Sequence, residues 1–194
     1  MMGYKLERLT VMVVDDNKNM RSLVRAILEA LGVSHVIEAQ DGEAAFKKLK
    51  EQQIDLIIVD WNMEPVDGVT FTRKVRTDPE SPDQFVPIIM LSGHTEKARV
   101  MQARDAGITE FMAKPIAARA LYARMVAVIE HPRTFVKTAS YFGPDRRRQD
   151  MPFPGPDRRS TAVKGGKSGK GNLSEDQQKA LSQAKDAIRT LDKS

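Results

Sequence analysis

Two adjacent aspartates, Asp15 and Asp16, directly follow an apolar run in the stretch VMVVDDNKNM, residues 11–20. Neighbouring side chains on a strand point to opposite faces, and carboxylates this close together repel one another. Three more polar residues follow apolar runs in the same way, namely Asp60 after DLIIV, Ser92 after VPIIML and Lys114 after ITEFMA. These carboxylates, the hydroxyl and the ammonium are the side chains whose types and positions could do chemistry together.

Brought to one place, these groups would suit an oxygen-liganded metal ion and an incoming phosphoryl group. Two like charges about 4 Å apart cost roughly 4 kcal/mol at an effective dielectric of 20, so three carboxylates there need a cation. An oxygen-only, partly open site suits Mg²⁺, which keeps waters and accepts phosphate oxygens. Mg²⁺ and Lys114 would neutralise a phosphoryl group and leave one carboxylate free to attack it.

The elements that must position these residues are five strands alternating with five helices along residues 1–131. Apolar runs rich in β-branched residues lie at 9–14, 35–39, 55–59, 86–91 and 108–113. Between them, apolar residues recur three and four positions apart, which predicts helices, and Gly32 and Gly107 stand where two of these should end. The alternation predicts a doubly wound parallel sheet covered on both faces. In such a sheet, ligands bind beyond the carboxyl ends of the strands.

Charge separates this region from the rest of the 194-residue chain. Residues 1–131 contain 17 Lys and Arg against 19 Asp and Glu, whereas residues 132–194 contain 14 against 7. The basic part is also rich in Pro and Gly, so we expect the packed domain, residues 1–131, to end near Pro132. Cysteine is absent, which excludes disulfides and thiolate metal sites. The apolar runs are too short for a membrane span or signal peptide, and we expect a cytoplasmic protein.

Four stretches follow a joint pattern, namely VVDD (13–16), VDWNMEPVDG (59–68), MLSGH (90–94) and FMAKP (111–115). Together they resemble the receiver domain of bacterial two-component response regulators, over roughly residues 8–131. The resemblance implies a flavodoxin-like fold with strand order 2-1-3-4-5, an order known for this class. It also implies a phosphoacceptor that takes a phosphoryl group from a sensor histidine kinase or a histidine phosphotransfer protein. Such a protein is no enzyme beyond its own phosphorylation and dephosphorylation.

The resemblance implies a role for each carboxylate. Asp60 would be the phosphoacceptor and would form an acyl phosphate. Asp15, Asp16 and Asp60 would hold Mg²⁺ together with the backbone carbonyl of Asn62.

It also implies how the domain switches. Ser92 would hydrogen-bond one phosphoryl oxygen and Lys114 would pair with another, while Gly93 leaves room for the group to enter. Phe111 occupies the aromatic switch position, whose ring moves inward with Ser92. Glu64 departs from the family pattern, which usually has Met-Pro after the aspartate, whereas here Glu64 intervenes and Pro65 comes one place later. We expect a reshaped loop and an unchanged nucleophile.

The remainder of the chain is predicted to be a basic linker over residues 132–172 and an amphipathic helix over residues 173–194. The linker contains the element Gly-Pro-Asp-Arg-Arg twice, at 143–147 and 155–159. The Gly-Pro and Pro-Asp steps favour turns or extended chain. Each element is either part of a solvated linker or a docking segment whose Arg forks seek carboxylates or phosphates.

Three functions remain open. The first is a stand-alone response regulator that signals to a downstream protein target, since no recognition fold or enzymatic domain follows the receiver. The second is a phosphoryl sink or relay intermediate, which the sequence does not separate from the first. The third is a nucleic-acid-binding regulator using the basic tail, which we do not expect because aromatic residues are few there.

Overall fold

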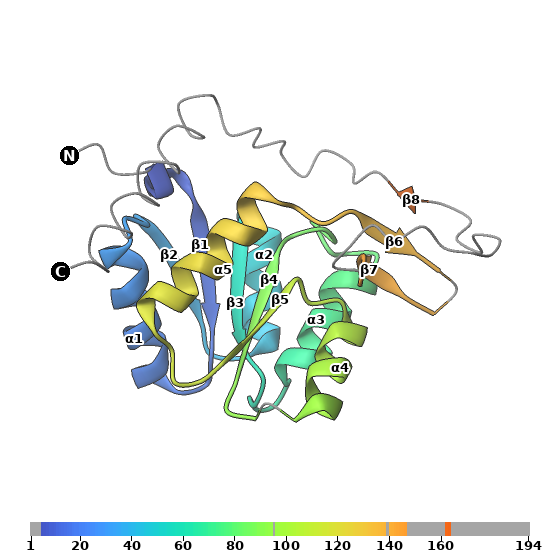
Figure 1. Cartoon of the computed structure of the whole chain (residues 1–194), viewed down its shortest axis with the longest axis horizontal. Helices are drawn as coiled ribbons and strands as arrows, with labels where there is room; N and C mark the ends of the chain where they lie inside the picture. Colours follow the sequence, from blue (N-terminus) through green and yellow to red (C-terminus); the bar gives the residue numbers. More distant parts are fainter. Residues whose placement is uncertain (1–4, 95, 139, 147–161, 164–194) are drawn as a thin grey trace, which may run out of the picture.

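A five-stranded parallel sheet forms the centre of the domain (Figure 1). The computed structural model describes residues 5–94, 96–138, 140–146 and 162–163. The strands are β1 (Thr10–Val14), β2 (His35–Ala39), β3 (Leu56–Asp60), β4 (Ile88–Ser92) and β5 (Glu110–Ala113). Their order is β2-β1-β3-β4-β5, with every neighbouring pair parallel. The doubly wound, flavodoxin-like fold predicted from the sequence is therefore confirmed.

Five helices connect and cover the strands, after a 3₁₀ turn at Lys5–Arg8. They are α1 (Lys18–Ala30), α2 (Gly42–Glu51), α3 (Gly68–Thr77), α4 (Lys97–Ala106) and α5 (Ala118–Glu130). The side chains of Asn17, Asp41 and Asp67 accept backbone N–H groups at the starts of α1, α2 and α3. Gly32 and Gly107 have φ of 91° and 99°, in the left-handed region that favours glycine, and lie at helix ends as predicted.

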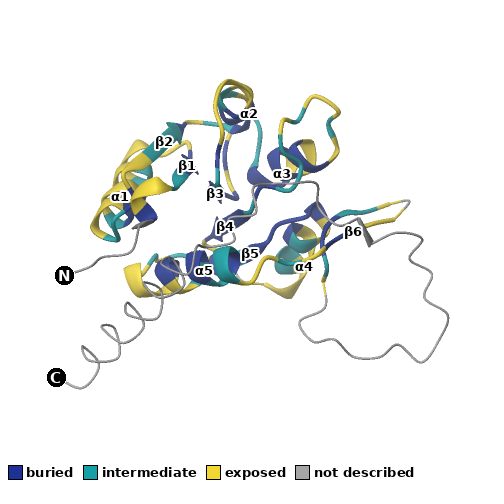
Figure 2. Ribbon diagram, turned by 90° about the horizontal axis from the view of Figure 1, so that it is seen from above, coloured by how far each residue is buried: buried dark blue, intermediate teal, exposed yellow. Residues whose placement is uncertain are grey.

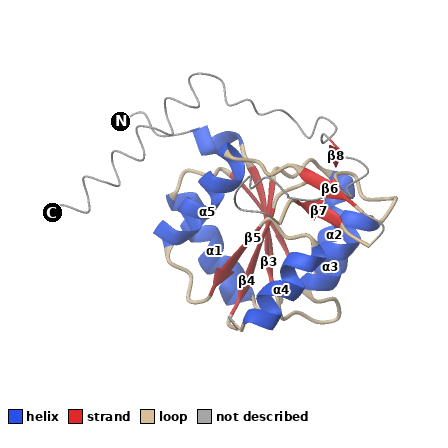
Figure 3. Cartoon of the chain, turned by 45° about the vertical axis from the view of Figure 1, so that its right-hand side comes forward, coloured by secondary structure: helices blue, strands red, loops and turns tan. Residues whose placement is uncertain are grey.

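The core has two parts, one on each face of the sheet. Side chains of successive strand residues point to opposite faces, so Met12 and Val14 belong to one part and Val11 and Val13 to the other. Helices α2, α3 and α4 cover the first face, while α1 and α5 cover the second (Figure 3). The central strands β1, β3 and β4 are almost entirely buried, whereas the edge strand β2 and the outer faces of the helices are partly or fully exposed (Figure 2). The polar strand ends are thus held by a rigid, doubly covered sheet.

The segment after residue 132 was expected to be a linker, but its described part is not one. Strands β6 (Phe135–Lys137) and β7 (Phe142–Pro144) form an antiparallel hairpin, and β8 (Ala162–Val163) pairs with the other edge of β6. The rings of Phe135 and Phe142 lie 5.0 and 5.4 Å from the ring of Phe85, in edge-to-face contact. This aromatic cluster fixes the hairpin to the loop that leads into β4, beside α3 (Figure 1).

Arg76 of α3 is buried between its helix and the hairpin, where it contacts the ring of Phe135. Its side chain is 1% exposed, and it donates to the carbonyls of Gly107 (2.9 Å) and Gln84 (2.8 Å). The guanidinium also lies 5.2 Å from the centre of the Phe135 ring. Burial lowers the pKa of Arg76 to about 9. A charged residue on a helix is therefore part of the packed interior here.

The first Gly-Pro-Asp-Arg-Arg element is docked on the domain through Gly143 and Arg146. Arg146 pairs with Asp105 at 3.2 Å, and its guanidinium lies 3.9 Å from the centre of the Tyr141 ring. A Cβ at Gly143 would lie only 2.9 Å from the Cα of Gly107, so the two backbones are in close contact. Arg146 thus pairs with a carboxylate, as the docking-segment interpretation predicted, and that carboxylate belongs to this chain.

The second Gly-Pro-Asp-Arg-Arg element, the rest of the predicted linker up to residue 172 and the predicted helix at 173–194 lie outside the described residues, except for β8. Within the part that the structure describes, no helix has both the length and the apolar character needed to cross a membrane.

Candidate functional site

The polar residues identified from the sequence meet at the carboxyl edge of the sheet. Asp60 is the last residue of β3 and Ser92 the last of β4, while Asp15 and Lys114 directly follow β1 and β5. The hydrogen bonds between neighbouring strands continue beyond the strand ends. The N–H of Asp15 donates to the carbonyl oxygen of Ala39 at 3.2 Å, and the N–H of Lys114 donates to that of Ser92 at 2.8 Å. The sheet itself therefore positions the backbone of the site.

Lys114 joins two buried carboxylates. Its Nζ lies 2.9 Å from Oδ1 of Asp60 and 3.2 Å from Oδ2 of Asp15. Asp60 is 6% exposed and Asp15 is 2% exposed, whereas the Lys114 side chain is 23% exposed. One ammonium at the edge of the site thus pairs with two largely buried carboxylates and offsets one of their two charges.

Burial and the neighbouring charges shift the pKa values of this pair. Burial raises the pKa of Asp60, and the nearby Asp15 raises it further. The hydrogen bond and charge of Lys114 lower that pKa only in part, so it stays above its ordinary value. For Lys114, burial lowers the pKa, but the two carboxylates outweigh burial and the pKa is raised. The ammonium is therefore firmly charged at neutral pH.

The second oxygen of Asp60 faces the loop that follows β3. The backbone N–H of Asn62 donates to Oδ2 of Asp60 at 3.2 Å. Gly68 closes this loop, donating its N–H to the Trp61 carbonyl at 3.0 Å, and a Cβ at Gly68 would lie 2.1 Å from the Asp60 carbonyl oxygen. Only glycine fits there. The loop that contains the unusual Glu64 is thus tied back to the strand.

The residues expected to respond to a phosphoryl group lie around the same edge. Ser92 is buried, and its Oγ accepts the backbone N–H of His94 at 3.0 Å. A Cβ at Gly93 would meet nothing within 4 Å, so space is open beside that residue. Phe111 is half-buried and packs against the core part under α2, α3 and α4. Trp61 is buried, and the guanidinium of Arg99 lies 5.6 Å from its ring centre.

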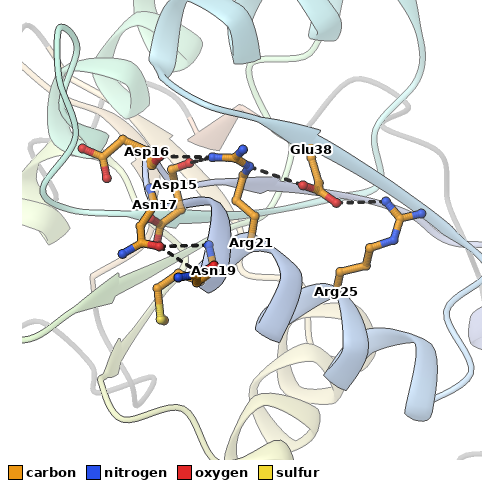
Figure 4. Close-up of polar contacts among 8 residues, drawn as sticks. Asp15, Asp16, Asn17, Asn19, Arg21, Arg25 and Glu38 are labelled. Atoms are coloured by element: carbon orange, nitrogen blue, oxygen red, sulfur yellow. Dashed lines mark hydrogen bonds and ion pairs between the residues drawn. The ribbon is translucent and has the colours of Figure 1, made fainter.

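Asp16 differs from the other two aspartates. It is exposed, and no hydrogen bond or ion pair joins its carboxylate to another described residue. In Figure 4 the carboxylate points away from Arg21, which contacts only the backbone carbonyl of Asp16. Within the described residues, no three carboxylate or imidazole groups converge closely enough to hold a metal ion. The site as it stands brings together Asp15, Asp60 and Lys114.

Sequence reasoning did not identify the contacts that hold the Asp15–Asp16 backbone. Arg21 of α1 donates to both of these carbonyls, and Glu38 of β2 holds Arg21 (Figure 4). The only sequence signal was an Arg one helical turn into α1, which reads equally well as a solvated residue. The N-cap Asn17 was also missed, although Asn before a helix is a known capping signal.

Comparison with known proteins is consistent with this geometry. Residues 11–126 match the family described as the response regulator receiver domain. Chemotaxis protein CheY-3 of Vibrio cholerae is 28% identical over 124 residues, which cover 64% of this chain and 94% of that protein. Chemotaxis protein CheY of Pseudomonas aeruginosa is 28% identical over 122 residues, covering 63% and 97%.

Solved structures show the same likeness. The chemotaxis response regulator CheY4 of Vibrio cholerae superposes with a TM-score of 0.56 at 30% identity, covering 62% of this chain and 98% of that one. A two-component response regulator from Clostridium difficile superposes with a TM-score of 0.58 at 22% identity, covering 64% and 98%. At that lower identity the likeness concerns the fold alone.

Proposed function

Because the chain belongs to the response regulator receiver domain family, we propose that Asp60 accepts a phosphoryl group from a sensor histidine kinase or a histidine phosphotransfer protein. The observation that carries this proposal is the shared ammonium of Lys114, 2.9 Å from Asp60 and 3.2 Å from Asp15. Its positive charge lies beside Asp60, and a phosphoryl group on Asp60 would need such a charge near its oxygens.

The transfer exchanges one bond to phosphorus for another. An Asp60 carboxylate oxygen forms a bond to phosphorus, the bond from phosphorus to the donor imidazole nitrogen breaks, and the imidazole keeps the electron pair. Asp60 must be ionised to attack, and Lys114 favours that form against the effect of burial. Gly93 leaves open space beside the strand end for the incoming group.

The donor set fits Mg²⁺. Lys114 offsets one of the three carboxylate charges of Asp15, Asp16 and Asp60, and a divalent cation would offset the other two. All available ligands are oxygens, which Mg²⁺ prefers. Asp16 is exposed, and its carboxylate has no partner among the described residues, so it can turn toward an ion without breaking a hydrogen bond to any of them. We propose that these three carboxylates and the Asn62 carbonyl hold the ion, which would neutralise phosphoryl charge.

We further propose that phosphorylation changes which protein the domain contacts. Ser92 Oγ would leave the N–H of His94 for a phosphoryl oxygen, and Phe111 of the neighbouring strand β5 would move inward. Phe111 is only half-buried in this structure, so an inward movement would bury more of its ring. The phosphorylated domain would then present a changed surface to a downstream protein target.

The test is labelling with acetyl phosphate in the presence of Mg²⁺, followed by intact mass spectrometry. We expect the wild type to gain one phosphoryl group, and Asp60→Asn to gain none. Asp55→Asn is the matched control, because Asp55 lies at the opposite end of the same strand, where it accepts the N–H of Thr10. Label in Asp60→Asn, or wild-type labelling unaffected by a chelator, would contradict the proposal.

A further inference from the structure

Arg21 holds the backbone of the acidic pair from one side. Its Nη1 donates to the carbonyl oxygen of Asp15 at 2.7 Å and to that of Asp16 at 3.2 Å (Figure 4). Its own N–H bonds the carbonyl of Asn17 at 3.1 Å, so the same residue belongs to the first turn of α1. The guanidinium therefore ties the Asp15–Asp16 peptide units to a rigid helix.

Glu38 orients Arg21 from the neighbouring strand. Its Oε2 lies 3.3 Å from Nε of Arg21, while its Oε1 lies 2.9 Å from Nη1 of Arg25. The hydrogen bond from Arg25, followed by that from Arg21, lowers the pKa of Glu38, so the carboxylate stays ionised. The Arg21 side chain is only 14% exposed, whereas that of Arg25 is 44% exposed and pairs also with Glu29. Arg21 is the buried member of this network.

These contacts fix the backbone and leave the carboxylates available. Arg21 bonds two carbonyl oxygens and neither carboxylate, so it orients the acidic pair without occupying it. Asp15 is held on its far side as well, because its Oδ1 accepts the N–H of Asn17 at 2.9 Å and its Oδ2 meets Lys114. Outer residues that orient ligands in this way commonly control metal affinity.

We propose that Arg21 is a positioning residue for Asp15 and Asp16, and that Glu38 keeps its guanidinium in place. This inference rests on the proposed function, in which the acidic pair holds Mg²⁺. Two explanations of Arg21 predict opposite changes in Mg²⁺ affinity when its side chain is removed. A positive charge beside the site repels a cation, so removing it would tighten Mg²⁺ binding if charge alone mattered. A positioning role predicts weaker binding instead.

The test is a Mg²⁺ titration of Arg21→Ala, Arg21→Lys, Glu38→Gln and the wild type. Binding is measured both by calorimetry and by the fluorescence of Trp61. Trp61 is the only tryptophan of the chain and directly follows Asp60. We expect the dissociation constant to rise about tenfold in Arg21→Ala, the lower end of the range for lost outer residues. Arg21→Lys keeps the charge but loses the planar fork, so it should also bind more weakly.

Arg25→Ala is the matched control, because Arg25 shares Glu38 but touches neither aspartate. Its Mg²⁺ affinity should match that of the wild type. At saturating Mg²⁺, the Arg21 variants should be labelled at Asp60 nearly as fast as the wild type, since the defect lies in binding. Urea unfolding checks that each variant is folded at the temperature used. If Arg21→Ala unfolds, Glu38→Gln still tests the network, because in that variant Arg21 itself is not changed.

The outcomes separate the two proposals. Equal affinity in wild type, Arg21→Lys and Glu38→Gln, or tighter binding by Arg21→Ala, would overturn the positioning role alone. A wild type that binds no Mg²⁺ would overturn the proposed metal site, and the role of Arg21 with it.

Discussion

Replacing Lys114 with alanine should destabilise the domain strongly, because it leaves two buried carboxylates without their shared cation. Replacing Asp60 with asparagine should cost far less, since Lys114 still pairs with Asp15 in that variant. The two changes should therefore not be additive. In the double variant, a single carboxylate remains and most of the loss should be recovered.

The distances set the size of the effect. Charges separated by 2.9 and 3.2 Å attract by about 5 to 6 kcal/mol each at an effective dielectric of 20. Desolvation of Lys114 and the aspartates offsets most of this attraction. Removal of one partner from a buried pair costs about 3–5 kcal/mol. Because the Lys114 side chain is 23% exposed, we expect the lower end, about 3 kcal/mol.

The assay is urea unfolding at neutral pH without Mg²⁺, for wild type, Lys114→Ala, Asp60→Asn and the double variant. Lys50→Ala is the control, because Lys50 forms an exposed ion pair with Glu80 that should contribute about 1 kcal/mol or less. A Lys114→Ala loss as small as that of Lys50→Ala would refute the reasoning. So would a double variant no more stable than Lys114→Ala.

Three further predictions concern Asp60 and the hairpin. Since the folded pKa of Asp60 is raised above its ordinary 3.8, the folded chain holds this proton to higher pH than the unfolded chain does. Wild type should therefore lose stability relative to Asp60→Asn as pH rises from about 3.8 through the raised pKa, measured by unfolding across that window. A stability difference between the two proteins that stays constant across this pH range would contradict the raised pKa of Asp60. Gly143→Ala should cost about 1–3 kcal/mol, because its Cβ would lie 2.9 Å from the Cα of Gly107. An unchanged thermal unfolding temperature of Gly143→Ala would show that the hairpin backbone moves to accept the added Cβ at no cost. Arg146→Ala should speed amide hydrogen exchange in β6 and β7 with a loss of about 0.5–1 kcal/mol, since it removes the Asp105 pair and the ring contact. Equal amide hydrogen exchange of β6 and β7 in wild type and variant would show that Arg146 does not hold the hairpin on the domain.

The sequence alone predicted the sheet and the residues at its edge. Strand identity is a local property here, because runs such as LIIV at 56–59 are buried on both faces and need no distant information to be recognised. The convergence of Asp15, Asp60 and Lys114 follows from parallel topology, which brings the carboxyl ends of neighbouring strands to one edge. The order of those strands came from the family resemblance and not from the residues.

The direction of individual side chains at that edge was not predictable from the sequence. Asp15 and Asp16 are adjacent and chemically identical, yet Asp15 is buried against Lys114, whereas Asp16 is exposed and its carboxylate has no partner in the described part of the chain. Which of the two faces the site depends on where β1 ends and where Asn17 starts α1. Those boundaries are set by packing and capping to within a residue, which periodicity does not resolve.

The tertiary structure also decided what the segment after residue 132 does. Gly-Pro and Pro-Asp steps indicated an extended linker, and nothing local shows that Phe135 and Phe142 pack on Phe85, about fifty residues earlier in the chain. The buried Arg76 is a similar case, since its partners are carbonyls of loops brought beside α3 only in the folded chain. Hydrophobic periodicity reports neighbours in sequence, whereas ring clusters and hydrogen bonds to distant carbonyls exist only once the sheet has brought separate loops together.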